Sequence, residues 1–131
     1  MSQAKNVEIV RGFYEAFARE EFPVEVIDPE VEYVNPSGAV EEGTRHGVAA
    51  FREAVEQVFE GWATWNMEPE QFMAVGNQVA VVVRYRARGR TSGVELEGRE
   101  SALLTLREGK VVRYEWFHEP TDALRAAESR T

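Results

Sequence analysis

The chain has 131 residues, 44% of them hydrophobic and 29% charged, so it can bury a core and is too apolar to be disordered. It contains no cysteine, which excludes disulfides, thiolate metal sites and cysteine nucleophiles and favours a reducing, cytoplasmic location. The formal net charge of −8 disfavours nucleic acid as a partner, and no segment has the roughly 18 consecutive apolar residues that a membrane helix needs.

Two amphipathic helices are predicted in the first half of the chain. Apolar residues recur three and four positions apart over residues 6–19 and again over 47–61, which is the spacing of one helix face. Between these helices, a helical turn is predicted at 24–28 and a short strand at 31–35. Residues 36–47 are rich in glycine, serine and glutamate and are predicted to form a loop.

After residue 61 the hydrophobic period changes from 3.6 to 2, which indicates strands. The predicted strands cover residues 65–75, 78–90, 95–107 and 111–119. Short turns containing glycine separate them, as is typical of β-hairpins. A last helix is predicted over 121–128. Helices segregated from an antiparallel sheet define an α+β fold, and we expect one domain over residues 1–131.

Five local sequences accompany this order of elements. They are EIVRGFYEAF at 8–17, YVNP at 33–36, GVAAF at 47–51, EGKVVRY at 108–114 and EPTDAL at 119–124. Together they resemble the NTF2-like superfold and, within it, the SnoaL-like group. The resemblance implies a cone-shaped fold in which a curved mixed or antiparallel sheet wraps around the N-terminal helices and encloses a cavity. This fold hosts isomerases, cyclases, dehydratases, epoxide hydrolases and non-enzymatic domains.

Strand alternation and helix periodicity assign side chains to the expected cavity. The strand that ends near residue 35 sets the reference, because its tyrosine and asparagine point inward in similar proteins. The ligand-binding residues predicted on this basis are Tyr14, Phe17, Tyr33, Asn35, Phe51, Val55, Val58, Trp62, Val83, Tyr85 and Trp116. They would form an apolar, aromatic pocket of the kind that holds a small hydrophobic molecule. A register error of one residue would invert a strand's whole set.

Two ionisable residues, Glu100 and His118, fall on the same faces. A carboxylate that points into an apolar cavity is desolvated, so we expect its pKa to be raised. A neighbouring imidazole would complete an acid–base couple near neutral pH. The structural alternatives are that Glu100 pairs with Arg84 and that His118 bonds to the backbone at the sheet edge. A metal site is not predicted, because the two histidines lie far apart and carboxylate spacings typical of metal ligands are missing. No cofactor is predicted either.

The catalytic sets of known relatives are incomplete in this chain. Epoxide hydrolases of this fold use an Asp-Arg-Asp set, and the matching positions here hold Val83, Tyr85 and Trp116. Steroid isomerases place an aspartate base in the region of the first strand, where Asn35 has no useful basicity. Tyr33 and Asn35 have a structural alternative too, as a strand-end tyrosine followed by an Asn-Pro turn.

The leading hypothesis is a cofactor-independent isomerase, cyclase or dehydratase that acts on a hydrophobic carbonyl compound. Glu100 and His118 would transfer protons, in place of the aspartate and histidine of SnoaL-type polyketide cyclases, while Tyr33 and Asn35 orient the substrate. The alternative is a non-catalytic binding protein for a hydrophobic or aromatic ligand. A third hypothesis is an assembly domain that uses its sheet face and fills its cavity with its own side chains.

Two further groups are assigned to surfaces outside the cavity. Val82, Leu103 and Phe117 would be exposed together on the outer sheet face, so we expect a homodimer through that face. A second group alternates along one strand and is expected to form a solvated or ion-pairing face: Arg84, Arg86, Arg88 and Arg90.

Overall fold

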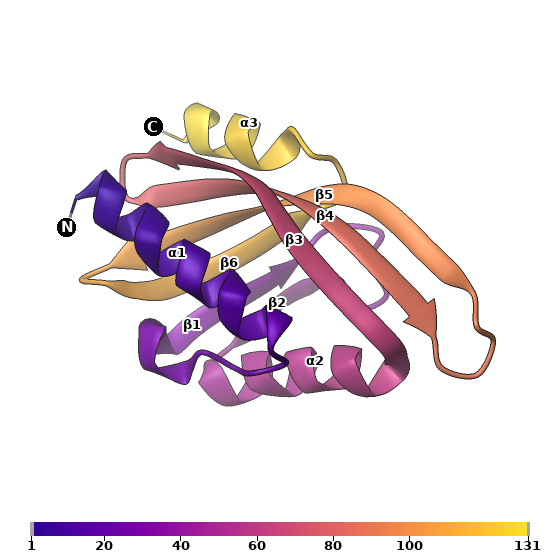
Figure 1. Ribbon diagram of the computed structural model, residues 1–131. Coiled ribbons are helices and arrows are strands. Elements are labelled where there is room, and N and C mark those ends of the chain that lie inside the picture. The colour runs from indigo at the N-terminus through magenta and orange to yellow at the C-terminus, as the bar shows by residue number, and fades with distance from the viewer. Residues whose placement is uncertain (1, 131) are drawn as a thin grey trace.

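One curved sheet organises the fold in the computed structural model, which describes residues 2–130 (Figure 1). The elements are α1 (Gln3–Ala18), the 3-10 turn η1 (Val24–Val26), β1 (Ile27–Asn35), β2 (Gly43–His46), α2 (Val48–Gly61), β3 (Trp62–Val75), β4 (Gln78–Gly89), β5 (Glu95–Arg107), β6 (Lys110–Phe117) and α3 (Asp122–Ser129). This arrangement confirms the predicted α+β cone.

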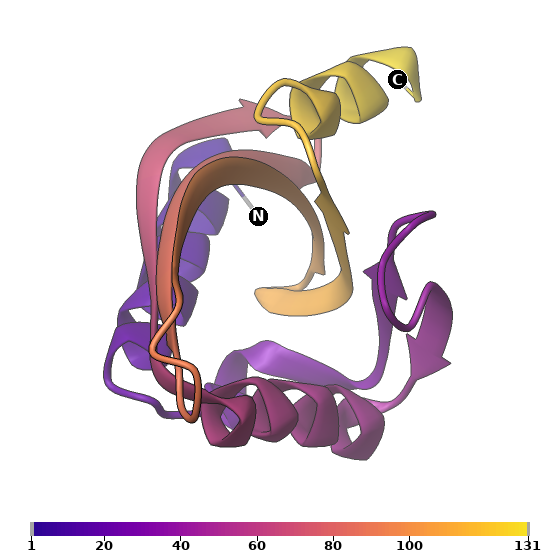
Figure 2. The same ribbon diagram turned by 90° about the vertical axis from the view of Figure 1, so that its right-hand side faces the viewer.

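The strands follow the order β2-β1-β6-β5-β4-β3. Neighbouring strands are antiparallel except for β1 and β6, which run parallel and bring residues distant in sequence together. Figure 2 shows the sheet curling around an interior, with α2 lying across one end of the curl and α3 lying outside it. The sheet therefore has an inner face, toward α1 and α2, and an outer face, partly covered by α3.

The main core fills the narrow part of the cone between α1 and the inner sheet face. Ser2 caps α1, because its side chain accepts a hydrogen bond from the backbone N–H of Lys5 at 3.1 Å. Further along the helix, the fully buried Phe13 stacks on Tyr114 of β6, with ring centroids 5.7 Å apart. Phe51 of α2 joins the same aromatic cluster, so both helices are anchored on one set of rings.

Three local predictions were wrong. Residues 43–46 form β2, a strand paired with β1, within the segment predicted as loop. The sequence of β2 is Gly-Thr-Arg-His, which has no apolar alternation, because this strand lies at the sheet edge and buries little. β1 begins at Ile27 and not at residue 31, so it takes up the end of the turn predicted at 24–28. β3 begins at Trp62 and not at residue 65.

The outer face differs from the prediction at Leu103. Leu103 is fully buried, because α3 covers it with Ala123 and Ala127. The expected exposed patch is therefore smaller and comprises the half-buried Val82 and Phe117. The homodimer through this face stays a prediction, with less apolar surface behind it than the sequence indicated.

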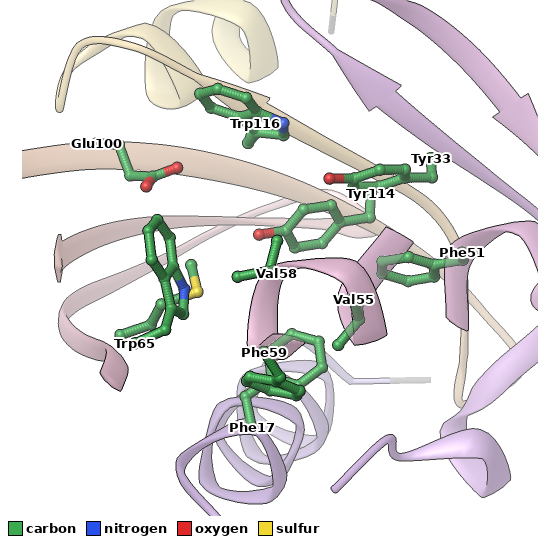
Figure 3. Close-up of a pocket in the computed structure, with 11 residues that line it drawn as sticks. Phe17, Tyr33, Phe51, Val55, Val58, Phe59, Trp65, Glu100, Tyr114 and Trp116 are labelled. Atoms are coloured by element: carbon green, nitrogen blue, oxygen red, sulfur yellow. The ribbon is translucent and has the colours of Figure 1, made fainter. Parts of the chain in front are cut away.

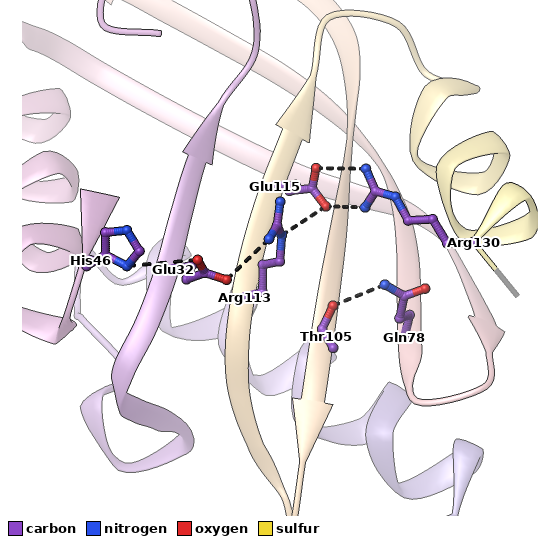
Figure 4. A network of polar contacts seen from close by, with 7 residues as sticks. All are labelled: Glu32, His46, Gln78, Thr105, Arg113, Glu115 and Arg130. Carbon is purple, nitrogen blue, oxygen red and sulfur yellow. Dashed lines mark hydrogen bonds and ion pairs between the residues drawn. The ribbon is translucent and has the colours of Figure 1, made fainter. Parts of the chain in front are cut away.

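A network of polar and charged side chains lies on the outer face (Figure 4). Glu115 on β6 is 5% exposed and receives hydrogen bonds from Arg113 at 3.3 Å and from Arg130 at 2.6 Å. Arg113 also reaches Glu32 on β1 at 3.2 Å. This network ties β1, β6 and the end of α3 together.

Three of the four alternating arginines form ion pairs as predicted, and the fourth, Arg90, donates hydrogen bonds to backbone carbonyls. Arg84 and Arg86 pair with Glu97, and Arg88 pairs with Glu95 across the β4–β5 hairpin. No helix of the described residues is long and apolar enough to cross a membrane.

Candidate functional site

An apolar pocket of about 180 Å³ lies between α2, the end of α1 and the inner sheet face (Figure 3). Its lining residues are Phe17, Tyr33, Phe51, Val55, Val58, Phe59, Trp65, Met67, Glu100, Tyr114 and Trp116. Aromatic and aliphatic side chains make up the wall, and Glu100 is its one carboxylate. This composition is that of a small-molecule site with few polar groups.

Several residues assigned to the cavity from the sequence lie on this wall. They are Phe17, Tyr33, Phe51, Val55, Val58, Glu100 and Trp116. Tyr14 and Val83 face the same interior but are completely buried in the core behind it. Trp62 lies outside the pocket, in a shallow hollow beside the tip of the β4–β5 hairpin.

Four lining residues were not among the site residues derived from the sequence: Phe59, Trp65, Met67 and Tyr114. The spacing of each residue in the sequence indicated that it shares a face with a neighbouring residue. Phe59 follows Val55 by four positions on α2, and Trp65 and Met67 alternate on β3. Tyr114 precedes Trp116 by two positions and therefore shares its strand face.

Glu100 reaches the pocket from β5, directly opposite Val83 of β4. Its carboxyl group makes no hydrogen bond or ion pair with any side chain that the structure describes. Burial in these apolar surroundings raises the pKa of Glu100 to about 7. The alternative partner, Arg84, pairs with Glu97 on the other sheet face.

Two phenol groups share the pocket with this carboxyl. The hydroxyls of Tyr33 and Tyr114 point into the interior, toward the side where Glu100 lies (Figure 3). Their rings are stacked 5.8 Å apart, and Tyr33 also stacks on Phe51 at 4.8 Å. Burial raises the pKa of both phenols, so they remain protonated hydrogen-bond donors at neutral pH.

Tyr14 stands behind Tyr114, out of the pocket. Its fully buried hydroxyl has no hydrogen-bond partner within residues 2–130, and burial raises its pKa.

Asn35 acts on the pocket through Trp116. Its side-chain oxygen accepts a hydrogen bond from Nε1 of Trp116 at 2.6 Å, and its amide group donates to the backbone carbonyl of Glu41 at 2.7 Å. Because both ends of the amide are occupied, Asn35 orients an aromatic wall and holds the following loop. It is not among the residues that line the pocket.

His118 lies at the rim, outside the pocket lining. Pairing between β5 and β6 ends at Phe117, one residue before His118. The exposed imidazole packs edge-on against Trp116, with ring centroids 5.1 Å apart, and its Nε2 lies 3.3 Å from the backbone oxygen of Ser37. This contact is the backbone role foreseen for His118, and the structure does not place the imidazole beside Glu100 in the pocket wall.

Tyr85 was predicted to bind the ligand, but it is not among the residues that line the pocket; it stacks on Trp65, which does line it. Their rings are parallel within 8° and 6.0 Å apart. Tyr85 lies across Gly98 of β5, where an added Cβ atom would meet the Tyr85 oxygen at 2.7 Å. The absence of a side chain at Gly98 therefore allows Tyr85 to lie flat on the sheet.

Within residues 2–130 no group of three histidine, cysteine or acidic side chains is placed to hold a metal ion. The polar groups on the pocket wall include the carboxyl of Glu100 and the phenols of Tyr33 and Tyr114.

Comparisons with known proteins agree with this fold. A family model, the SnoaL-like domain, matches residues 10–114. No curated protein matches the chain. An NTF2-like protein from Burkholderia xenovorans LB400 is 25% identical, with 97% of this chain and 98% of that chain covered and a TM-score of 0.76.

Two further solved structures have the same fold. An NTF2-like protein from Burkholderia pseudomallei K96243 is 24% identical over 95% of this chain and 97% of that chain, with a TM-score of 0.79. TerC, co-crystallised with polyporic acid, is 22% identical over 95% of this chain and 98% of that chain, with a TM-score of 0.78. The match over residues 10–114 shows that the chain belongs to the SnoaL-like family, and the solved structures show that it has the NTF2-like fold.

Proposed function

We propose that the protein is a cofactor-independent acid–base catalyst for a hydrophobic carbonyl compound, with Glu100 as the group that moves the proton. The observation that carries this proposal is the unpaired carboxyl of Glu100 in an otherwise apolar pocket. Buried carboxyl groups without a partner are costly, and they are concentrated at sites that use them.

The proposed reaction begins with proton abstraction next to the carbonyl group. The Glu100 carboxylate takes the proton from the α-carbon, the C–H bond breaks, and its electron pair moves so that the carbonyl oxygen becomes an enolate oxygen. Tyr33 and Tyr114 donate hydrogen bonds to that oxygen. In a substrate with a carbon–carbon double bond between the β- and γ-carbons, the enolate extends over that bond. Return of the proton from Glu100 to the γ-carbon then moves the double bond into conjugation with the carbonyl group and completes an isomerisation without any cofactor.

The acidity of Glu100 suits this role. A base with a pKa of about 7 binds protons more strongly than an ordinary carboxylate and is still half ionised at neutral pH. Tyr33 and Tyr114 stay protonated because burial raises their pKa values, so they can stabilise negative charge on oxygen. TerC, which shares the fold, was co-crystallised with a small molecule, polyporic acid, which supports a small-molecule ligand here.

The test uses exchange of α-protons for deuterium, which requires no knowledge of the natural substrate. Acetophenone and 2-tetralone are incubated with the protein in D₂O, and loss of the α-proton signal is followed by NMR. We expect exchange above the buffer rate, rising with pH to a plateau above about 7 as Glu100 ionises.

Glu100→Gln should lower the protein-dependent rate by about 100-fold or more. Glu97→Gln is the matched control, because Glu97 lies on the same strand but faces the outer side and pairs with arginines. Equal exchange by the wild type and Glu100→Gln would rule out the proposal.

A second candidate is a binding protein that holds the same class of ligand without turnover. The observation that favours it is the predominance of aromatic rings in the wall, beside a single carboxyl that could act only as a hydrogen-bonding group. Saturable binding of both ketones without any protein-dependent exchange would select this function.

A further inference from the structure

The pocket has room for a small ligand only. Its volume is about 180 Å³. An apolar cavity of about 150 Å³ in another protein accommodates benzene, so this pocket holds one ring with a short substituent. A larger ligand must therefore extend out of the mouth.

Apolar side chains continue the inner sheet face beyond the pocket wall. Trp65, which lines the pocket, stands in one cross-strand row with Ala87 of β4 and Leu96 of β5. Leu96 is 44% exposed, and Val94 near the hairpin tip is 54% exposed. Trp62 packs against Trp65 at 5.7 Å. We call Trp62, Val94 and Leu96 the hairpin strip.

The charged residues of the same hairpin lie on its other face. Arg86 and Arg88 alternate with Ala87, and Glu95 and Glu97 alternate with Leu96, so their ion pairs form on the outer side. The hairpin thus presents an apolar inner surface that leads away from the pocket. Figure 1 shows this hairpin projecting beyond the other strands.

Arg90 fixes the hairpin relative to the pocket. Its guanidinium group donates hydrogen bonds to the backbone carbonyls of Phe59, Glu60 and Trp62, at 3.3, 2.9 and 3.0 Å. These carbonyls lie at the end of α2, and Phe59 itself lines the pocket. The hairpin strip and the pocket wall are therefore held together before any ligand arrives, which lowers the ordering cost of binding.

We propose that the hairpin strip binds the apolar tail of an elongated ligand whose carbonyl-bearing end occupies the pocket. This inference rests on the proposed function and adds the ligand's shape to it. Leu96 is the residue that sets the preference for tail length, because it is the exposed apolar side chain in the same row as Trp65.

The test is a series of alkyl phenyl ketones from acetophenone to octanophenone, titrated into ¹⁵N-labelled protein and followed by NMR. The phenyl ketone end stays constant, and only the tail grows. For the wild type we expect the Kd to fall by up to about fourfold for each methylene that the strip covers. Amide signals at residues 94–96 should shift with octanophenone and not with acetophenone.

Leu96→Thr keeps a residue suited to a strand and removes most of the apolar contact. It should weaken octanophenone binding by about fivefold and leave acetophenone within twofold of the wild type. Val24→Thr is the matched control, because Val24 is similarly exposed, at 47%, but lies on η1, away from the pocket lining. Val24→Thr should leave both affinities unchanged.

The outcomes separate this inference from the proposed function. Acetophenone binding and exchange without any gain in affinity for longer tails would overturn the tail site alone. An equal gain in affinity with tail length in the wild type and in Leu96→Thr would mean that the tail binds elsewhere. This result would also overturn the tail site. Failure of every ketone to bind would overturn both proposals. If the ligand-free wild type sediments as a dimer and Leu96→Thr as a monomer, the strip is an interface between two copies of the chain. That result would overturn the tail site.

Discussion

Glu100 and Glu115 are carboxylates on neighbouring strands that face opposite sides of one sheet. Glu115, on the outer face, is 5% exposed and receives hydrogen bonds from Arg113 and Arg130. Glu100, on the inner face, is half-buried beside aromatic rings and has no such partner within residues 2–130. The same residue type is therefore structural on one face and chemically available on the other.

The difference shows that partners, more than burial, decide what a buried carboxylate does. Two guanidinium groups compensate the charge of Glu115 and use its oxygens to join β6 to the end of α3. No compensation acts on Glu100, so desolvation raises its pKa to about 7 and leaves its oxygens free for a ligand. Removing the charge of Glu115 should therefore lower the stability of the fold, whereas removing the charge of Glu100 should raise it.

Glu115→Gln should give the largest loss of stability. It leaves Arg113 and Arg130 facing an uncharged amide on a buried position, at a cost of about 3 kcal/mol. This figure is at the low end for buried ion pairs because both arginines are partly exposed. Urea denaturation at pH 7 measures it.

Glu8→Gln is the control for this variant, since Glu8 forms an exposed ion pair with Lys5 and should cost under about 0.5 kcal/mol. Equal losses for Glu8→Gln and Glu115→Gln would contradict a structural role for Glu115.

Glu100→Gln should stabilise the protein at pH 8. The folded-state pKa of Glu100 is above its ordinary value, so the folded protein holds a proton that the unfolded chain releases as pH rises from about 4.5 to about 7. The wild type therefore loses stability between about pH 4.5 and pH 7. Glu100→Gln has no proton to release, so it does not lose this stability. The shift corresponds to at most about 3 kcal/mol, and partial exposure reduces the expected gain to about 2 kcal/mol.

Urea denaturation at pH 5 and pH 8 tests whether Glu100→Gln stabilises the protein as predicted. The gain of Glu100→Gln over the wild type should be under about 1 kcal/mol at pH 5, because Glu100 is protonated in the folded state there. Glu97→Gln should show no gain at either pH, since its arginine partners lower the pKa of Glu97. A destabilised Glu100→Gln at pH 8 would show that Glu100 has a compensating partner.

Ser101→Ala tests how much the hydrogen bonds of Ser101, the residue after Glu100, contribute to stability on the outer face. The buried Ser101 hydroxyl donates to the carbonyl of Glu119 at 2.6 Å and accepts from the N–H of Ala123 at 3.1 Å. Its removal leaves both backbone groups without that partner and should cost about 1–2 kcal/mol in urea denaturation. Ser129→Ala removes an exposed hydroxyl bonded to Ala126 and should have little effect.

His118→Ala should have the smallest effect. The imidazole is exposed at the rim, so its loss should change stability by under about 0.5 kcal/mol. If Glu100 moves the proton alone, deuterium exchange should stay within twofold of the wild type. A tenfold slower exchange would instead restore the acid–base couple predicted from the sequence.

Local pattern was enough to predict much of this protein. The period-2 alternation and the glycine-containing turns predicted β5 at residues 95–107, the bounds that the structure has. For the pocket, the resemblance to similar proteins set Tyr33 inward, alternation then assigned Glu100 and Trp116 to the same face, and the structure places all three on the pocket wall. The bounds and alternation of a strand depend on neighbours along that strand, so the sequence contains them.

Only the tertiary structure decided which polar groups have partners. Asn35 meets Trp116 through the parallel pairing of β1 with β6, and Glu115 meets Arg130 because α3 folds back over the sheet. That same return of α3 buries Leu103. The short polar β2 exists because β1 offers it a free edge. These contacts join residues far apart in sequence, and no local periodicity encodes them.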